Sequence, residues 1–156
     1  MLRVFTHIKM SRMIKKKDVQ GLLKYLIANI DRNPIIAGKA MIGLTKIGKP
    51  SSEAICRILP SIKHMFLKFA LIRVLYTIGD LGCVNTLINL VKEYGEKIIS
   101  RKDKSELNVK GETSVYFMAL KTLKHMGSSP SEWGISSESY YNQIREDYEK
   151  CDNVIK

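Results

Sequence analysis

The chain has few of the residues on which disulfide scaffolds, metal sites and aromatic platforms depend. It contains three cysteines, one tryptophan and four prolines among 156 residues, and only 8% of its residues are aromatic. Cys56, Cys83 and Cys151 form no C-x-x-C pair, and none of them has a spacing to histidine that is typical of a metal site. We therefore predict buried, reduced thiols in an intracellular protein and expect no metal.

Long apolar runs are also missing. The longest apolar stretch, Met65–Ile78, is interrupted by two basic residues and is too short to cross a bilayer. The basic N-terminal segment, residues 1–17, carries six Lys/Arg and no acid but lacks the uninterrupted apolar core of a secretion signal. We expect a basic first helix, no membrane span and a cytoplasmic protein. An amphipathic transit peptide, or a later start at Met10 or Met13, is an alternative.

Acidic residues are scarce in the first half of the chain. The formal net charge is +11, and residues 1–50 hold eleven Lys/Arg against two acids, whereas residues 105–156 hold six against eight. This asymmetry predicts a molecule that is basic at its N-terminal end and slightly acidic at its C-terminal end. The charge indicates a polyanion, an anionic lipid surface or an acidic protein as a partner. Alternatively, it reflects a composition rich in lysine and isoleucine.

The chain does contain a repeated helical pattern. Three nine-residue segments, which end at Gly48, Gly79 and Gly127, can be laid over one another, and each is apolar at i, i+4 and i+7. These apolar sets are Ala40/Leu44/Ile47, Leu71/Leu75/Ile78 and Ala119/Leu123/Met126. Each glycine is expected to end its helix in a left-handed conformation.

A second helical pattern alternates with these segments. Its apolar residues follow i, i+3, i+4 and i+7, a wide stripe that another helix must cover. The sets are Val19/Leu22/Leu23/Leu26, Ile55/Ile58/Leu59/Ile62 and Val84/Leu87/Ile88/Val91. Asp18, Ser51 or Ser52, and Asp80 stand where helix N-caps belong. The two patterns together predict an all-α stack of helix pairs.

The glycine spacing reveals one insertion. The distance is 31 residues from Gly48 to Gly79 but 48 residues from Gly79 to Gly127. A polar run from Ser100 to Ser105 breaks the periodicity within the longer interval. We therefore predict a lengthened second helix followed by an exposed insertion loop over 95–112.

The last unit differs from the others and is predicted to be a C-terminal cap, residues 128–156. We expect a helix at about 137–151 with Tyr141, Ile144 and Tyr148 facing inward and Arg145 where a core residue would stand. A polar residue suits that face because nothing stacks beyond a terminal repeat.

Segments 38–50 and 70–80 resemble the short HEAT-type repeat that also occurs in phycobilin-lyase-like proteins. The resemblance covers about 18–127, although only Asp80 keeps the aspartate that often follows the glycine. It implies a single HEAT-like repeat domain, 1–156, built as a right-handed α-solenoid of about four HEAT-like helix pairs. It also implies that the second helices line a concave, partner-binding face.

Signatures of catalysis are missing. The sequence contains no nucleophile elbow, P-loop or dinucleotide fingerprint, and His7, His64 and His125 are isolated. Cys83 near a helix start is interpreted as a packed cysteine rather than a reactive thiolate. We predict a non-catalytic scaffold or adaptor for a protein partner, without a cofactor. The alternatives are a binder of the nucleic-acid backbone, and a lyase-like or glycosylase-like enzyme or enzyme subunit, which the resemblance brings in.

The candidate polyanion contacts are the basic residues of the N-terminal segment, the second helices and the insertion. They are Lys15, Lys16, Lys17, Lys24, Arg57, Lys63, Lys92, Arg101, Lys102 and Lys104. A nucleic-acid binder should gather them on one surface, whereas a scaffold should expose an apolar or aromatic patch. The aromatics of the tail, among them Trp133 and Tyr140, lie away from most of the basic residues, which argues against a single-strand binder.

Overall fold

The computed structural model describes residues 2–100 and 109–154, and for residues 2–7, 109 and 110 it describes the backbone only. Within these ranges the chain forms eight α-helices, three short 3-10 turns and no strand, which confirms the predicted all-α class. The helices are α1 (Leu2–Lys15), α2 (Val19–Asn29), α3 (Pro34–Ile47), α4 (Lys49–Ile58), α5 (Met65–Ile78), α6 (Val84–Ser100), α7 (Val109–His125) and α8 (Glu138–Val154). The 3-10 turns are η1 (Leu59–Ser61), η2 (Leu81–Cys83) and η3 (Pro130–Glu132).

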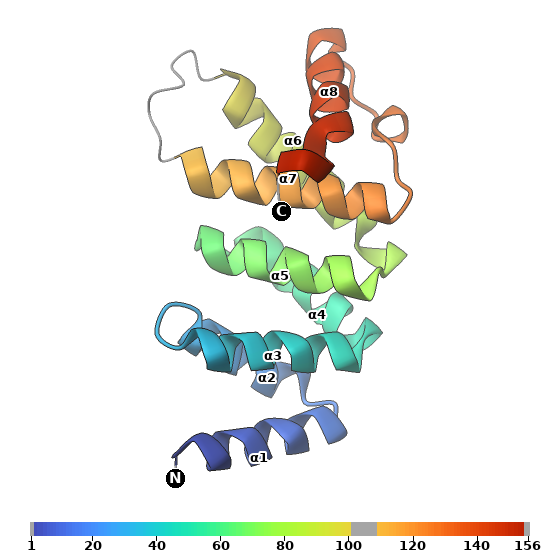
Figure 1. Cartoon of the computed structure of the whole chain (residues 1–156). Helices are drawn as coiled ribbons and strands as arrows, with labels where there is room; N and C mark the ends of the chain where they lie inside the picture. The colour runs from blue at the N-terminus through green and yellow to red at the C-terminus, as the bar shows by residue number, and fades with distance from the viewer. Residues whose placement is uncertain (1, 101–108, 155–156) are drawn as a thin grey trace.

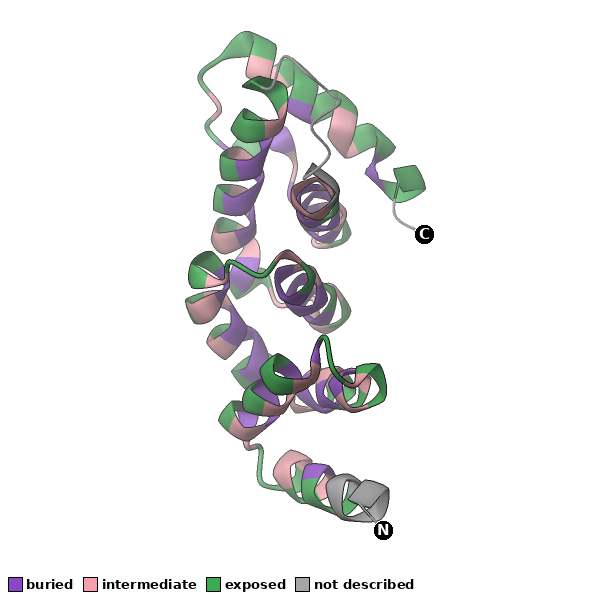
Figure 2. Cartoon of the chain, turned by 90° about the vertical axis from the view of Figure 1, so that its left-hand side faces the viewer, coloured by how far each residue is buried: buried purple, intermediate pink, exposed green. Residues whose placement is uncertain are grey.

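The helices lie in two layers (Figure 1). A front layer consists of α1, α3, α5 and α7, and each of these helices packs against the next one. A back layer consists of α2, α4 and α6, and the side view of Figure 2 shows it on the left of the front layer. The last helix, α8, crosses the end of the stack and contacts α7, α6 and η3. The front-layer helices therefore present one long face to solvent.

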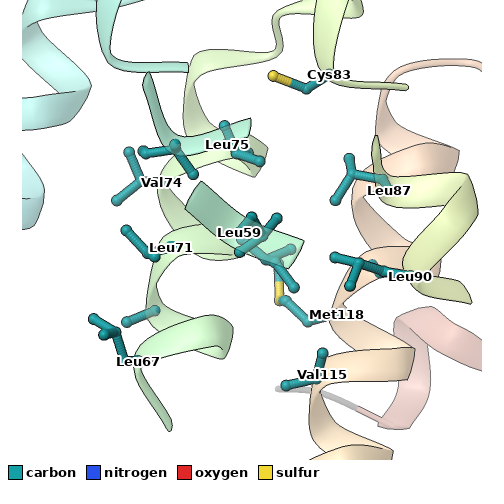
Figure 3. Packing of buried hydrophobic residues seen from close by; sticks show 14 of the residues in the cluster. Leu59, Leu67, Leu71, Val74, Leu75, Cys83, Leu87, Leu90, Val115 and Met118 are labelled. Carbon is teal, nitrogen blue, oxygen red and sulfur yellow. The ribbon is translucent and has the colours of Figure 1, made fainter. Parts of the chain in front are cut away.

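The core lies between the two layers. Leu44, Leu75 and Leu123 are fully buried at the predicted inward positions of α3, α5 and α7. Figure 3 shows the buried side chains of α5 and the residues of α6 and α7 that surround Leu59 at the end of α4. Burial of a leucine side chain contributes about 1.5–3 kcal/mol, so these contacts hold the layers together. The periodic apolar pattern placed these three leucines correctly, whereas the predicted i+7 residues Ile47, Ile78 and Met126 are only half-buried.

The helix ends follow the predicted glycines. Gly48, Gly79 and Gly127 all have positive φ, and Gly79 at φ 68° and ψ 27° is left-handed, as expected. Gly48 at φ 77° and ψ −131° lies outside the left-handed helical region, so that expectation is wrong for it. Asp18 caps α2, because its side chain accepts a hydrogen bond from the Gly21 N–H at 2.8 Å. Asp80 caps the turn η2, which precedes α6, by accepting from the Gly82 N–H.

The predicted serine cap of α4 is wrong. The helix begins at Lys49 directly after Gly48, so Ser51 and Ser52 lie inside it and are fully buried. Pro50 stands in the first turn, where its fixed φ suits the helix and its missing N–H costs nothing. The Ser52 hydroxyl instead donates a hydrogen bond to the Asp80 carboxylate, which ties α4 to η2.

Helices occupy both ends of the predicted insertion loop, 95–112. The lengthened helix α6 continues to Ser100 and α7 begins at Val109, so residues 95–100 and 109–112 are helical. Burial explains the longer helix, because Val91, Tyr94 and Gly95 are still covered by neighbouring elements.

The C-terminal helix is slightly longer than expected, Glu138–Val154. Ile144 is fully buried and the Tyr148 hydroxyl donates to the Ser128 carbonyl at 2.9 Å, whereas Arg145 is exposed and lies over the Tyr141 ring. Arg145 therefore lies on an uncovered face of α8.

The expectation of three reduced thiols is wrong for two of them. Cys56 of α4 and Cys83 of η2 form a disulfide with their Cα atoms 6.1 Å apart. They are 27 residues apart in sequence, and the packing of α4 against η2 brings them together. Cys83 is packed, as predicted, but it carries no free thiol. Cys151 is a buried free cysteine, and burial raises the pKa of its thiol.

Within residues 2–100 and 109–154, no helix is both long enough and apolar enough to span a membrane. The expectation of no membrane-spanning helix is confirmed for this part of the chain.

Candidate functional site

Four of the first five helices, α1, α2, α3 and α5, contain no Asp or Glu. The helices α1, α3 and α5 contain four, two and two Lys/Arg, respectively, and no Asp or Glu. In the back layer, α2 carries one lysine and no acid, α4 carries both signs of charge, and Lys97 of α6 pairs with Glu93 at 2.6 Å. Three consecutive helices of the front layer are therefore basic without acids of their own, which favours an acidic partner on that side.

The outward stripe of α3 alternates apolar and basic side chains. Ile35, Lys39, Ile42 and Lys46 are all exposed, and their spacing of three or four residues places them on one helical face. Ile35 is 61% exposed and Ile42 is 57% exposed. Exposed large apolar side chains beside cations are typical of a surface that binds a partner protein.

Helix α5 presents a matching stripe beside α3. Phe66 is 57% exposed, and Arg73 and Thr77 follow it at helical spacing on the same side. Phe69 lies between them and is half-buried against the core. The two stripes together join an apolar surface to three cations.

A groove, here called the α3–α5 groove, runs between these two stripes. Its larger hollow has a volume of about 520 Å³ and lies between the C-terminal halves of the two helices. A smaller hollow of about 180 Å³ lies between their N-terminal halves, and both hollows are lined by Gly38, Met41 and Arg73. The complete lining of the groove is Ile30, Pro34, Ala37, Gly38, Met41, Ile42, Thr45, Lys46, Phe66, Phe69, Ala70, Arg73, Val74 and Thr77.

The groove has a neighbour on the same face. A hollow of about 230 Å³ lies between α1 and α3, with Met10 and Ile14 from α1 in its lining. Ile42 and Lys46 line this hollow and the larger hollow of the α3–α5 groove. The front layer is therefore indented on both sides of α3.

Gly38 leaves the floor of the groove open. A Cβ added at this position would have no heavy atom within 4 Å, although the residue lies inside a helix. Glycine in a helix interior destabilises it by about 0.5–1 kcal/mol relative to alanine. No packing contact of the folded chain requires this glycine, so its position fits the close approach of another molecule.

One acid lies near the N-terminal end of α5. His64 caps this helix, since its Nδ1 accepts from the Leu67 N–H at 3.1 Å, so its Nε2 carries the proton and donates to Asp31 at 2.9 Å. Asp31 is exposed and belongs to the turn that precedes α3. Its charge is partnered, which leaves Lys46 and Arg73 to dominate the other end of the groove.

Lys68 does not contribute to the groove. Its side chain is 2% exposed, and its ammonium group donates to the Tyr94 hydroxyl of α6 at 2.8 Å. Burial is the main cause that lowers the pKa of Lys68, and burial also raises the pKa of Tyr94 to about 12. This pair lies in the interior, where a bulky ligand has no access.

The predicted polyanion contacts are distributed over several elements of the fold. Their described members are exposed except for the half-buried Lys92, but they belong to different parts of the fold. Lys15, Lys16 and Lys17 lie at the end of α1 and in the following turn, Lys24, Arg57 and Lys92 lie on α2, α4 and α6, and Lys63 precedes α5. Arg101, Lys102 and Lys104 lie outside the described residues.

Sequence reasoning missed the cations of the groove, Lys46 and Arg73, and Lys39 of the neighbouring α1–α3 hollow. The HEAT resemblance placed the binding surface on the second helices, whereas the hollows described above lie between first helices. The available signal was the absence of acids from α3 and α5 together with isoleucines between the lysines of α3.

No relative assigns a role to this groove. No protein-family model, curated protein or solved structure matched the chain. Among the described residues, no three His, Cys, Asp or Glu side chains are grouped so as to hold a metal ion. The groove is thus the feature from which a function can be argued.

Proposed function

We propose that this chain is a non-catalytic adaptor that binds an acidic protein partner through the front layer. The observation that carries the proposal is the α3–α5 groove, an apolar surface with Lys46 and Arg73 in its lining, in a layer whose first three helices contain no acid. Apolar area supplies affinity, and complementary charge supplies orientation and a faster encounter.

A HEAT-like solenoid of four helix pairs is the architecture that we propose for this adaptor. The pairs are α1–α2, α3–α4, α5–α6 and α7–α8. Support comes from the contacts between successive front-layer helices and from the hydrogen bond between Ser52 and Asp80, which joins neighbouring pairs. In such a stack each pair buries its apolar face against the next one, and an extended surface remains for a partner.

Binding to a nucleic-acid backbone is the alternative, and the net charge of +11 favours it. The lining of the groove argues against it. Nucleic-acid interfaces are more polar and more positively charged than protein interfaces, whereas Met41, Phe69 and Val74 line this groove. The cations also flank apolar side chains instead of forming a continuous basic track.

Affinity capture from cells that express the chain tests the proposal. The front variant is Lys46→Glu with Arg73→Glu, and the matched control is Lys24→Glu with Arg57→Glu, which changes the net charge equally on back-layer helices. The wild type and the control should retain one acidic protein, and the front variant should lose it by about tenfold or more.

Equal capture by the front variant would show that the proposed surface is wrong. Release of the captured protein by nuclease, together with equal losses in both variants, would favour the nucleic-acid alternative.

A further inference from the structure

We infer that the α3–α5 groove receives one acidic amphipathic α-helix of about four turns from the partner protein. This inference rests on the proposed function and specifies the segment that the partner contributes. It follows from the length of the groove, its apolar floor, its open glycine and the cations on its two sides.

The length of the groove matches a helix of this size. Met41 and Arg73 line both hollows, so the groove continues from Pro34 and Phe66 at one end to Thr45 and Thr77 at the other. Helices α3 and α5 have 14 residues each, which corresponds to about 20 Å at roughly 1.5 Å per residue. A helix of four turns laid along this seam has the same length.

The floor of the groove suits the apolar side of such a helix. Met41, Phe69 and Val74 provide apolar contacts, and Met adapts its shape to different side chains. Small residues alternate with them, and Gly38 leaves open space. An amphipathic helix projects apolar side chains at i, i+3, i+4 and i+7, which is the arrangement that a groove between two helices receives.

The flanks of the groove determine the charge of the helix. Lys46 lies on the α3 side and Arg73 lies on the α5 side, so one cation stands on each side of the floor. Neither α3 nor α5 contains an acid that would compete with the partner for these cations. Carboxylates on the two polar edges of a docked helix would meet them, and Arg73 offers a bidentate contact.

Other occupants fit less well. An extended peptide that adds to a sheet needs free backbone groups at a strand edge, and the described residues form no strand. A lipid bilayer covers protruding apolar side chains, whereas the apolar surface here includes hollows of about 520 and 180 Å³. An anionic membrane therefore fits this surface less well than a helix does, and the experiment below includes anionic vesicles.

The experiment is a selection followed by mapping. A random library of 16-residue peptides displayed on phage is selected against the full chain, with counter-selection against Gly38→Leu, whose side chain would fill the open floor. Enriched peptides should carry apolar residues at helical spacing and a negative net charge. Gly38→Ala serves as a milder variant in case the leucine perturbs folding.

The selected peptide is then mapped by methyl NMR of the methionines in the wild-type chain. The Met41 methyl signal should shift because Met41 lines both hollows, and the buried Met118 should not. Arg73→Glu should weaken binding by about tenfold or more, whereas Arg57→Glu on α4 should leave it unchanged. A shift at Met10 without one at Met41 would place the helix between α1 and α3 and overturn the assignment.

Three other results would also overturn the inference. The first is enrichment of basic or extended proline-rich peptides, and the second is equal enrichment of peptides on the wild type and on Gly38→Leu. The third is binding to phosphatidylserine vesicles that is tighter than binding to the peptide and that Arg73→Glu abolishes. If cellular capture depends on Lys46 and Arg73 but no helical peptide is enriched, the helix is wrong and the adaptor proposal stands. If capture of the partner from cells does not depend on Lys46 or Arg73, the adaptor proposal is wrong, whichever peptides the library yields.

Discussion

Alanine substitution at two helical glycines should change stability in opposite directions. At Gly38 of α3 the new methyl group would meet nothing within 4 Å. The helix would gain the propensity difference between glycine and alanine, so Gly38→Ala should stabilise the fold by about 0.5–1 kcal/mol. At Gly95 of α6 the same methyl group would lie 2.7 Å from the Tyr140 hydroxyl and 3.2 Å from Tyr116 Cε2.

The crowding at Gly95 cannot be relieved cheaply. The Tyr140 hydroxyl donates to the Lys92 carbonyl at 2.7 Å, and the Tyr116 ring is 1% exposed. Moving Tyr140 away would cost its hydrogen bond, about 1 kcal/mol, and overpacking adds about 1–3 kcal/mol. After subtraction of the propensity gain, Gly95→Ala should destabilise the fold by about 1–3 kcal/mol.

Urea unfolding followed by circular dichroism measures both effects. The midpoint should rise for Gly38→Ala and fall for Gly95→Ala, with an unchanged slope in each case. A midpoint that rises for both variants would show that Tyr140 does not pack against α6 as described. A fall for Gly38→Ala would show that the groove floor is covered by the chain itself.

Three further predictions concern the core, the buried lysine and the disulfide. Leu75→Ala should cost about 2–5 kcal/mol in urea unfolding, and a loss below about 0.5 kcal/mol would mean that this helix face is misassigned. Lys68 has a pKa below its ordinary value of 10.5, mainly through burial. Between the pKa of Lys68 in the folded chain and its ordinary value, the unfolded chain binds more protons at this residue, so the stability of the wild type relative to Lys68→Met should rise with pH; parallel pH profiles would refute this. Reduction of Cys56–Cys83, which closes a loop with a sequence separation of 27, should cost up to about 3–4 kcal/mol in thermal or urea unfolding, and an unchanged midpoint with dithiothreitol would contradict it.

Local patterns made part of the fold predictable. Leu75 and Gly79 were identified because helical periodicity and a left-handed helix end depend on neighbours within a few residues. The same rule failed at Ser51 and Ser52. There Gly48 ends α3 and Pro50 starts α4 without a linker, so the helix begins earlier than an N-cap serine would allow.

Contacts between distant segments were not predictable. The pairing of Cys56 with Cys83 requires α4 to lie against η2, and no sequence spacing encodes that contact. The buried position of Lys68 likewise depends on Tyr94 of α6, to which it donates a hydrogen bond.

The α3–α5 groove could not be predicted from the sequence for the same reason. Each lysine of α3 was visible in the sequence, but only the packing of α3 beside α5 brings Lys46 and Arg73 to one hollow. The resemblance to HEAT repeats directed attention to the second helices and therefore to Lys24, Arg57 and Lys92. The helices α3 and α5 contain no acid, but α2 shares this absence, so composition alone did not identify the groove.

Photo-crosslinking at Phe66 tests the central claim most directly, that a protein partner binds over the α3–α5 groove. Benzoylphenylalanine replaces Phe66, which is 57% exposed beside the groove, and in a separate control it replaces the exposed Asn89 of α6. After irradiation in cells, the account predicts one acidic protein crosslinked through position 66 and not through position 89. Equal crosslinking from both positions, or a crosslink from position 66 to nucleic acid alone, would contradict it.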